Sequence, residues 1–317
     1  MTSLRLFYTT DIHGSETCFR KFVNTPAVYK ANVIVMGGDI TGKTVTPITE
    51  VNGAYQCRLL GETLTAKNKD EIQKLKDTVR SIGSYPFLTT PKELEEIQAH
   101  QDSKKEIFDR LITESLQRWI QLAEEKLKGK KAQCYISPGN DDSYAIDGVL
   151  SSSSVIVNPD RRCVRLDQEH EMVSLGLSNI TPWNCPRDVP EEKLKEILEH
   201  LSQDVERSET AVYNVHIPPF GTGIDDAPEL DKDLAPKLEP GGKLKMIPVG
   251  SKAVRELLEK RQPLLGLHGH IHESKGFFRL GRTLCLNPGS EYQEGILKGL
   301  LLQISGNKVK DFIFTSG

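Results

Sequence analysis

The sequence lacks the features of secreted, membrane-spanning and disulfide-rich proteins. Its 317 residues include six scattered cysteines and no Cys-x-x-Cys pair, so we expect reduced thiols rather than a disulfide framework or a cysteine-based zinc site. No apolar run approaches the roughly 18 residues that a transmembrane helix needs. The N-terminus has no basic segment followed by an apolar one, as a secretory signal would have. These absences predict a cytoplasmic protein without membrane contacts.

Positive charge is not in excess either. The net charge is −3, and 27% of the residues are charged, so the chain has no overall basic field of the kind that attracts nucleic acids. The basic run from Lys126 to Lys131 follows a predicted helix and is better explained as a solvated helix end. The two tryptophans and eight tyrosines form no evident base-stacking platform. Nucleic acid is therefore not an expected partner.

What is present is an alternation of apolar strands and amphipathic helices. Strand-like runs at 4–10 and 32–36 enclose a helical stretch at 17–30, broken or begun again near Pro26, which predicts a β–α–β unit. Asn52-Gly53 between alternating apolar and polar residues predicts a hairpin over 44–60. Further strands are expected at 132–136, 155–178, 212–215, 264–267, 276–286, 296–304 and 309–314, with helices at 188–207 and 251–261. We expect one α/β domain over residues 1–317.

Residues 62–130 differ in character from the rest. From Lys67 to Lys128 the only glycine is Gly83, charges are dense, and Thr90-Pro91 followed by Glu93 is typical of a helix start. Apolar residues recur three and four apart, the period of an amphipathic helix; they are Phe108, Leu111, Ile112, Leu116, Trp119, Ala123 and Leu127. We expect a helical insertion whose apolar stripe packs on the parent sheet, with a homodimer surface as the alternative. The Pro- and Gly-rich stretch 218–250 predicts a long loop.

Metal-competent side chains follow five of the predicted strands. Open α/β sheets bind ligands just past the carboxyl ends of their strands, so these side chains are expected to converge on one rim. Taken singly, each is explained more simply as a turn, cap or hydrogen-bonded residue, but the joint pattern favours a metal site. The seven are Asp11 and His13 after 4–10, Asp39 after 32–36, Asn140 after 132–136, His216 after 212–215, and His270 and His272 after 264–267.

The motifs around these residues are DIH, GGD, GND, a lone histidine before IPP, and GHIH, in that order, followed by NPGS at 287–290. This series resembles the signature of the calcineurin-like metallophosphoesterases and spans Asp11 to Ser290. The resemblance implies a four-layer αββα sandwich of two mixed sheets flanked by helices. It also implies two metal ions: the first held by Asp11, His13 and His272, the second by Asn140, His216 and His270, with Asp39 bridging them.

One position departs from the family pattern. Many members have a histidine after the GN pair, and that histidine contacts the phosphoryl group or protonates the leaving group. Here Asp141 stands in its place, and Asp142 matches the acidic position that follows. A carboxylate carries no proton at neutral pH and repels phosphate, so we expect weak activity on poor leaving groups and a relative preference for singly charged diesters.

Asp141, Asp142 and His268 are the candidate catalytic residues. His268 lies outside the matched motif, and three roles stay open for it: support of a metal ligand, contact with substrate, and structure.

The sequence thus predicts a metal-dependent phosphohydrolase. Mixed imidazole and carboxylate ligands suit manganese, iron or zinc better than magnesium or calcium. Two such ions can polarise phosphoryl oxygens and activate a bridging water, whose hydroxide attacks phosphorus in line. We favour a phosphodiesterase acting on a small, nucleotide-like diester. A phosphomonoesterase, including a protein phosphatase, stays open. So does a non-catalytic protein-interaction scaffold of the same fold, although every ligand position is filled.

Overall fold

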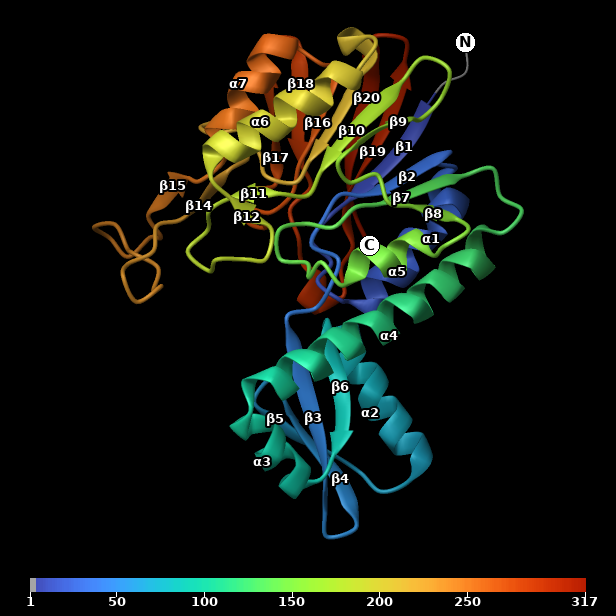
Figure 1. The fold of residues 1–317 in the computed structure, drawn as a ribbon, viewed down its shortest axis with the longest axis vertical. Helices are drawn as coiled ribbons and strands as arrows, with labels where there is room; N and C mark the ends of the chain where they lie inside the picture. The colour runs from blue at the N-terminus through green and yellow to red at the C-terminus, as the bar shows by residue number, and fades with distance from the viewer. Residues whose placement is uncertain (1–3) are drawn as a thin grey trace.

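A computed structural model of the chain describes residues 4–317 and contains two six-stranded sheets (Figure 1). The four parallel strands of each sheet are joined by antiparallel strands at the edges, so both sheets are mixed. The first sheet runs in the order β20 (Lys308–Ser316), β19 (Lys298–Ser305), β1 (Leu4–Thr9), β2 (Val33–Met36), β7 (Gln133–Ile136) and β8 (Ile156–Val157). The second runs β17 (Gly276–Leu280), β18 (Thr283–Asn287), β16 (Leu265–Leu267), β13 (Val212–Val215), β10 (Glu171–Leu175) and β9 (Arg162–Arg165).

The two sheets pack face to face, and helices cover their outer faces. Successive residues of β1 point to opposite sides: Leu6 and Tyr8 lie in the core between the sheets, whereas Phe7 joins the core on the helical side. The helices on that side are α1 (Glu16–Tyr29), α4 (Gln101–Leu127) and α5 (Ile146–Ser151). The helices on the second sheet are α6 (Glu191–Leu201) and α7 (Lys252–Arg261). The predicted four-layer αββα sandwich is confirmed.

Helix α1 continues through Pro26, where the sequence predicted a break. Proline has no amide hydrogen to donate to the carbonyl four residues earlier. The Thr25 hydroxyl donates instead to the Phe22 carbonyl oxygen at 2.7 Å. Because that carbonyl keeps a hydrogen bond, the helix tolerates Pro26 near its end.

The segment 62–130 is not all helical, contrary to the prediction. It contains the helices α2 (Lys69–Ser81), α3 (Pro91–Ala99) and α4, but also two strands, β5 (Glu62–Ala66) and β6 (Ser84–Thr89). These pair with β3 (Thr44–Val51) and β4 (Ala54–Leu59) in a four-stranded sheet ordered β5-β4-β3-β6, which lies below the sandwich in Figure 1.

Strand β6 depends on a distant partner, β3, with which it pairs in parallel. The sequence did not indicate β6, because the segments on either side of it are charged and have a helical pattern. Pro86 fits because β6 is an edge strand, where a missing amide donor is tolerated. The hairpin between β3 and β4 is confirmed: Asn52 and Gly53 have φ of 53° and 77°, as a tight hairpin turn requires.

The apolar stripe of α4 is buried inside the chain. Trp119 stacks on Phe19 of α1, with ring centroids 4.2 Å apart. The stripe therefore packs against the parent sandwich, the arrangement favoured from the sequence. Its buried apolar members are Leu111, Ile112, Leu116, Trp119, Ile120, Ala123 and Leu127.

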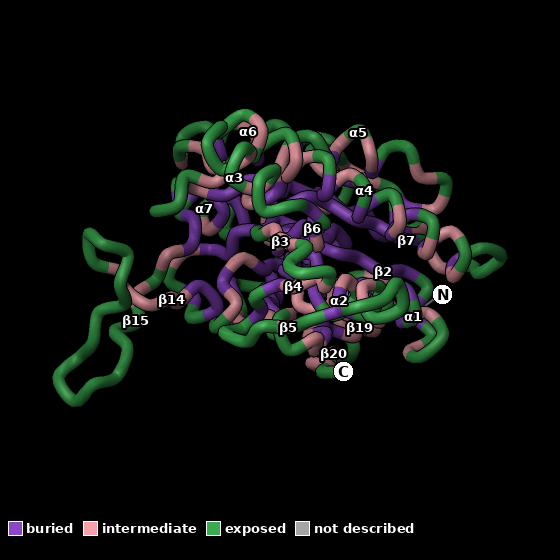
Figure 2. The backbone as a smooth tube through the Cα atoms, turned by 90° about the horizontal axis from the view of Figure 1, so that it is seen from below, coloured by how far each residue is buried: buried purple, intermediate pink, exposed green. Residues whose placement is uncertain are grey.

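The long loop at 218–250 includes only the short strands β14 (Asp226–Pro228) and β15 (Met246–Pro248), and residues 229–245 form a projecting, largely exposed arm (Figure 2). The other short elements are β11 (Ser178–Asn179), β12 (Asp188–Val189) and 3₁₀ turns at Ser202–Asp204, Ser208–Thr210 and Tyr292–Glu294. All six cysteines are free thiols. No helix between residues 4 and 317 combines the length and apolar character needed to cross a bilayer.

Candidate metal centre

The loops after β1, β2, β7, β13 and β16 carry all seven predicted ligands, and hydrogen bonds join several of these loops. The Asp11 amide donates to the Gly38 carbonyl oxygen at 2.9 Å, and the His13 amide donates to the Asp39 carbonyl oxygen at 3.0 Å. The His270 amide donates to the two Asp11 carboxylate oxygens at 3.1 and 3.0 Å. The loops after β1, β2 and β16 are therefore held together at the carboxyl ends of their strands.

The side chains form two groups that share a carboxylate. In the first group, His13 Nε2 lies 3.0 Å from His272 Nε2, which lies 3.4 Å from Asp11 Oδ1. In the second, His216 Nε2 lies 3.4 Å from Asp39 Oδ1, and the other Asp39 oxygen, Oδ2, lies 3.8 Å from His13 Nε2. Asp39 thus directs one oxygen toward each group.

Asn140 and His270 complete the second group. The amide oxygen of Asn140 lies 2.8 Å from His270 Nδ1. Its amide nitrogen donates to Asp188 Oδ1 at 2.9 Å, which fixes the amide oxygen on the His270 side. Asp39, His216 and His270 also offer ligand atoms within 4.8 Å of one another. The structure therefore brings together all seven residues that the sequence singled out.

The separations between these candidate ligand atoms are those expected around metal ions. Two ligands at about 2.0–2.1 Å from one ion, at angles of roughly 90–110°, lie about 2.9–3.4 Å apart. The separations of 3.0 and 3.4 Å in the first group fall in that range. In addition, His13 Nδ1 and His216 Nε2 are buried without a hydrogen bond among residues 4–317. A buried polar atom without a hydrogen-bond partner destabilises the folded protein. A bound cation would give His216 Nε2 a partner.

The backbone of the ligand loops is strained. Asp11, His13, Asp39 and His270 have φ of 54°, 38°, 48° and 67°, in the left-handed region. Residues other than glycine rarely adopt this conformation, and such strain concentrates at functional sites. Four of the seven candidate ligands therefore have a conformation that the surrounding structure imposes.

Two motif glycines are explained by close approach. A Cβ at Gly139 would lie 2.2 Å from Asp39 Oδ1, and one at Gly269 would lie 2.3 Å from Asp11 Oδ2. Both distances are far inside van der Waals contact. The glycines of GND and GHIH therefore leave room for the two carboxylates.

Burial and the buried carboxylates have opposite effects on the pKa values of the histidines. Burial lowers the pKa of His13 and of His270 to about 4. Burial also acts to lower the pKa of His216, but Asp39 and Asp11 outweigh it and raise this pKa to about 9. A cation that binds here at neutral pH must therefore displace a proton from His216.

Comparisons with known proteins bear on the fold. No family model matches the chain. An uncharacterised protein of Methanocaldococcus jannaschii, MJ1162, is 32% identical over 153 residues, which are 48% of this chain and 61% of that protein. The match thus spans less than two thirds of the relative.

Two solved structures align with almost the whole chain at low identity. One crystal structure has a TM-score of 0.58 at 15% identity, covering 99% of each chain. TT1561 of Thermus thermophilus has a TM-score of 0.54 at 13% identity, covering 100% of this chain and 99% of that one. A weaker likeness, with a TM-score of 0.43 at 9% identity and 98% coverage of each chain, is to a dimetal phosphatase from Danio rerio.

The two packed mixed sheets and the ordered motifs at their strand ends decide the fold. The chain has a four-layer αββα fold of two mixed sheets flanked by helices, and the structures with TM-scores of 0.58 and 0.54 share its overall fold. The four-layer fold expected from the motif resemblance is thereby confirmed.

Asp142 is engaged with the backbone. Its buried carboxylate accepts hydrogen bonds from the amides of Ile40, Thr41 and Gly139 at 3.0, 2.9 and 2.8 Å, and from the Thr41 hydroxyl. It therefore ties the loop after β2 to the loop after β7. This arrangement suits a residue that positions Asp39 and Asn140 rather than one that contacts substrate.

His268 belongs to neither group of candidate ligands. Its ring is buried, and Nδ1 lies 2.8 Å from the Val215 carbonyl oxygen, consistent with a donated hydrogen bond. Burial lowers its pKa to about 4, so the ring is neutral. Of the three roles left open by the sequence, this environment favours the structural one.

Asp141 is paired with a lysine that the sequence analysis missed. Its carboxylate forms an ion pair with Lys43 and accepts a hydrogen bond from the Cys185 thiol at 2.9 Å. The Tyr292 ring also borders the centre, with its centroid 4.8 Å from that of His13. No motif marks Lys43, because its partner lies 98 positions away in sequence. The ammonium group of Lys43 therefore compensates the negative charge of Asp141, which we expected from the sequence to be unopposed.

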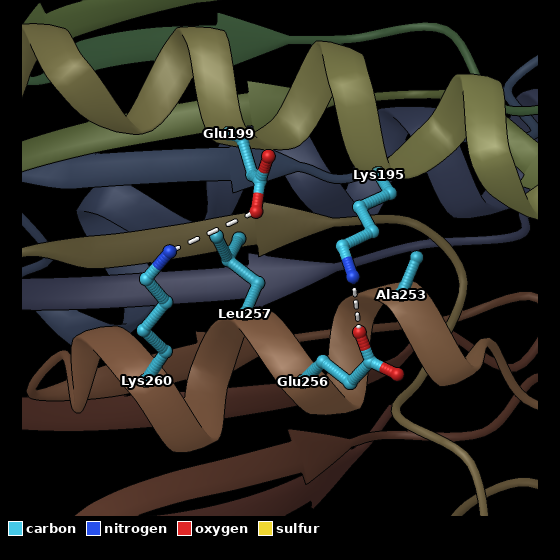
Figure 3. Close-up of a pocket in the computed structure, with 6 residues that line it drawn as sticks. All are labelled: Lys195, Glu199, Ala253, Glu256, Leu257 and Lys260. Carbon is cyan, nitrogen blue, oxygen red and sulfur yellow. Dashed lines mark hydrogen bonds and ion pairs between the residues drawn. The ribbon is translucent and has the colours of Figure 1, made fainter.

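Two clefts differ in their relation to the metal centre. One, of about 330 Å³, is bordered by His272 and by the NPGS motif, with lysines 275 and 298 and glutamates 273 and 291 in its wall. A smaller crevice lies between α6 and α7 (Figure 3). There Lys195 pairs with Glu256 at 2.7 Å and Lys260 with Glu199 at 3.8 Å, so its charges satisfy one another. Of these two clefts, the first borders a candidate ligand, His272, and the second borders none.

Proposed function

We propose that this protein is a metal-dependent phosphoesterase with a dinuclear centre. The observation that carries the proposal is Asp39, whose two oxygens face His216 and His13 in different donor groups. Paired metal ions about 3.5–4 Å apart are a recurrent device for phosphoester hydrolysis, and a shared carboxylate suits such a pair. The motif order and the fold support the same function.

The candidate ligands divide into one set for each of the two ions. Asp11, His13 and His272 would hold one ion, and Asn140, His216 and His270 the other, with Asp39 shared. Bound ions of this kind supply Lewis acidity to the phosphoryl group and a nucleophile derived from water at neutral pH. Manganese, iron and zinc suit this donor set.

The protein's own contribution is positional. Asp188 orients the amide of Asn140, and Asp142 holds the two loops that carry Asn140 and Asp39. The side chain of His272 is 28% exposed and borders the larger cleft, so substrate can reach the first group from there. Fixed ligands reduce the reorganisation needed when a phosphoester binds.

We further propose a preference for diesters, including small nucleotide-like ones. Asp141 and Lys43 together add no net charge where related sequences have an ionisable histidine. A monoester carries up to two negative charges at neutral pH and a diester one. The site therefore favours the diester relative to a histidine-containing site.

A substrate screen tests the proposal. Aryl and nucleotide mono- and diesters are offered to the protein loaded with manganese, iron or zinc, with Asp39→Asn as the inactive control. We expect metal-dependent hydrolysis that Asp39→Asn abolishes, with diesters hydrolysed faster. Stoichiometric metal binding without hydrolysis of any ester would instead favour a non-catalytic scaffold.

A further inference from the structure

Lys43 carries an ammonium group with unused hydrogen-bond donors at the rim of the metal centre. It precedes β3 in the loop that follows Asp39, and its side chain is 49% exposed. The ammonium pairs with Asp141 and makes no other hydrogen bond among residues 4–317. A lysine has three N–H donors, so two remain for a ligand.

The ammonium lies beside the candidate ligands, because its partner Asp141 offers a carboxylate oxygen within 4.8 Å of ligand atoms of His13 and Asp39. Its positive charge contributes to lowering the pKa of His13, which burial chiefly causes. Burial acts to lower the pKa of Lys43 itself, but Asp141 and then Asp39 outweigh it and raise this pKa. Lys43 therefore stays charged at neutral pH beside the candidate metal ligands.

Asp141 has the contacts of an anchor rather than of an acid. One carboxylate oxygen accepts from the Cys185 thiol at 2.9 Å, and the other faces Lys43. Its amide donates to Asp39 Oδ1 at 3.0 Å, which ties it to the shared carboxylate. Both carboxylate oxygens of Asp141 are therefore engaged with other side chains, as expected of a residue that positions Lys43.

We propose that Lys43 binds a non-bridging oxygen of the substrate's phosphoryl group and that Asp141 is the positioning residue that holds it there. The ligand class is a phosphoryl anion, including inorganic phosphate. The role in turnover rests on the proposed function, but the phosphate-binding role does not. Asp141 then does not take over the role of the family's histidine. It instead positions the ammonium group of Lys43 at the site.

Phosphate binding by the metal-loaded protein tests this. Isothermal titration with inorganic phosphate compares the wild type with Lys43→Gln, Lys43→Arg and the control Lys195→Gln. Lys195 is matched because its side chain is also 49% exposed and ion-paired, with Glu256 in the crevice of Figure 3. We expect Lys43→Gln to bind phosphate about 10- to 100-fold more weakly, as loss of a charged hydrogen bond implies. Lys43→Arg should be intermediate, and Lys195→Gln and the metal content should be unchanged.

The positioning role is tested with a double-mutant cycle. Asp141→Asn should weaken phosphate binding in the wild-type background but have little effect in the Lys43→Gln background, because it acts through Lys43. Equal effects of Asp141→Asn in the wild-type and Lys43→Gln backgrounds would show that Asp141 does not act through Lys43.

The proposal and the function can fail separately. Phosphate affinity within about twofold of wild type in Lys43→Gln, or loss of metal from that variant, overturns the proposal even if esters are hydrolysed. Absence of phosphate binding by the wild type also overturns it. Lysine-dependent phosphate binding without ester hydrolysis supports it and contradicts the phosphoesterase function.

Discussion

Replacing Asp39 by asparagine should change the protonation of His216 in the metal-free protein. Burial acts to lower the pKa of His216, and the carboxylates of Asp39 and Asp11, 3.4 and 3.8 Å away, raise it to about 9. The substitution removes the nearer carboxylate but keeps the shape of the side chain. It therefore isolates the electrostatic part of the arrangement.

The magnitude follows from the geometry. Unit charges 3.4 Å apart interact by about 5 kcal/mol at an effective dielectric constant of about 20, an upper figure of between three and four pKa units. Asp11 remains and continues to oppose burial. We expect the pKa of His216 to fall by about 2–4 units, toward the values of about 4 reached by His13 and His270.

Histidine-resolved NMR titration measures this after metal has been removed by chelation. Asp167→Asn is the matched control, because Asp167 lies 2.9 Å from another buried histidine, His170, outside the centre. The control should leave the pKa of His216 unchanged. A pKa of His216 that stays above 8 in Asp39→Asn would refute the reasoning, since the shared carboxylate would then not set the charge of the site.

The remaining predictions concern metal affinity, a motif glycine and the packing of α4. Because the pKa of His216 is raised to about 9, metal affinity measured by competition with a chelator should rise about tenfold per pH unit from 7 to 9; a flat profile contradicts this. Gly139→Ala should leave circular dichroism unchanged but abolish stoichiometric metal binding, because its Cβ would lie 2.2 Å from Asp39 Oδ1; full metal content would count against it. Trp119→Ala should lower the free energy of unfolding in urea by about 3–5 kcal/mol, since its ring stacks on Phe19, whereas metal affinity is retained; a loss below about 1 kcal/mol would show that α4 does not stabilise the sandwich.

The sequence was most informative where a residue's position followed from the strand or turn that contains or precedes it. His216 directly follows a short apolar strand, and the rule that ligands lie past the carboxyl ends of strands placed it at the same rim as the other candidates, whose joint pattern favoured a metal site. The hairpin at Asn52-Gly53 was predictable for a similar reason, because its turn chemistry is local. Each position could be read from a few adjacent residues, whereas the metal-binding role of His216 needed all seven candidates together.

What the sequence could not show depends on partners far away in the chain. Strand β6 exists because it pairs with β3 across 40 positions, and nothing in its charged flanks indicates that pairing. Asp141 and Asp142 are adjacent and of the same type, yet one carboxylate pairs with Lys43 and the other with backbone amides. No sequence pattern tells which way a carboxylate points.

Hydrogen bonds within the protein hold the loops of the centre in place. Backbone strain of about 1–3 kcal/mol for each left-handed ligand residue must be offset by the surrounding structure. The four hydrogen bonds to the Asp142 carboxylate and the two from the His270 amide to Asp11 are of the kind that can do so. Donors arranged in this way need little reorganisation to bind a cation. The strained loops are therefore part of how the site is built, because they direct carboxylates and imidazoles toward one another.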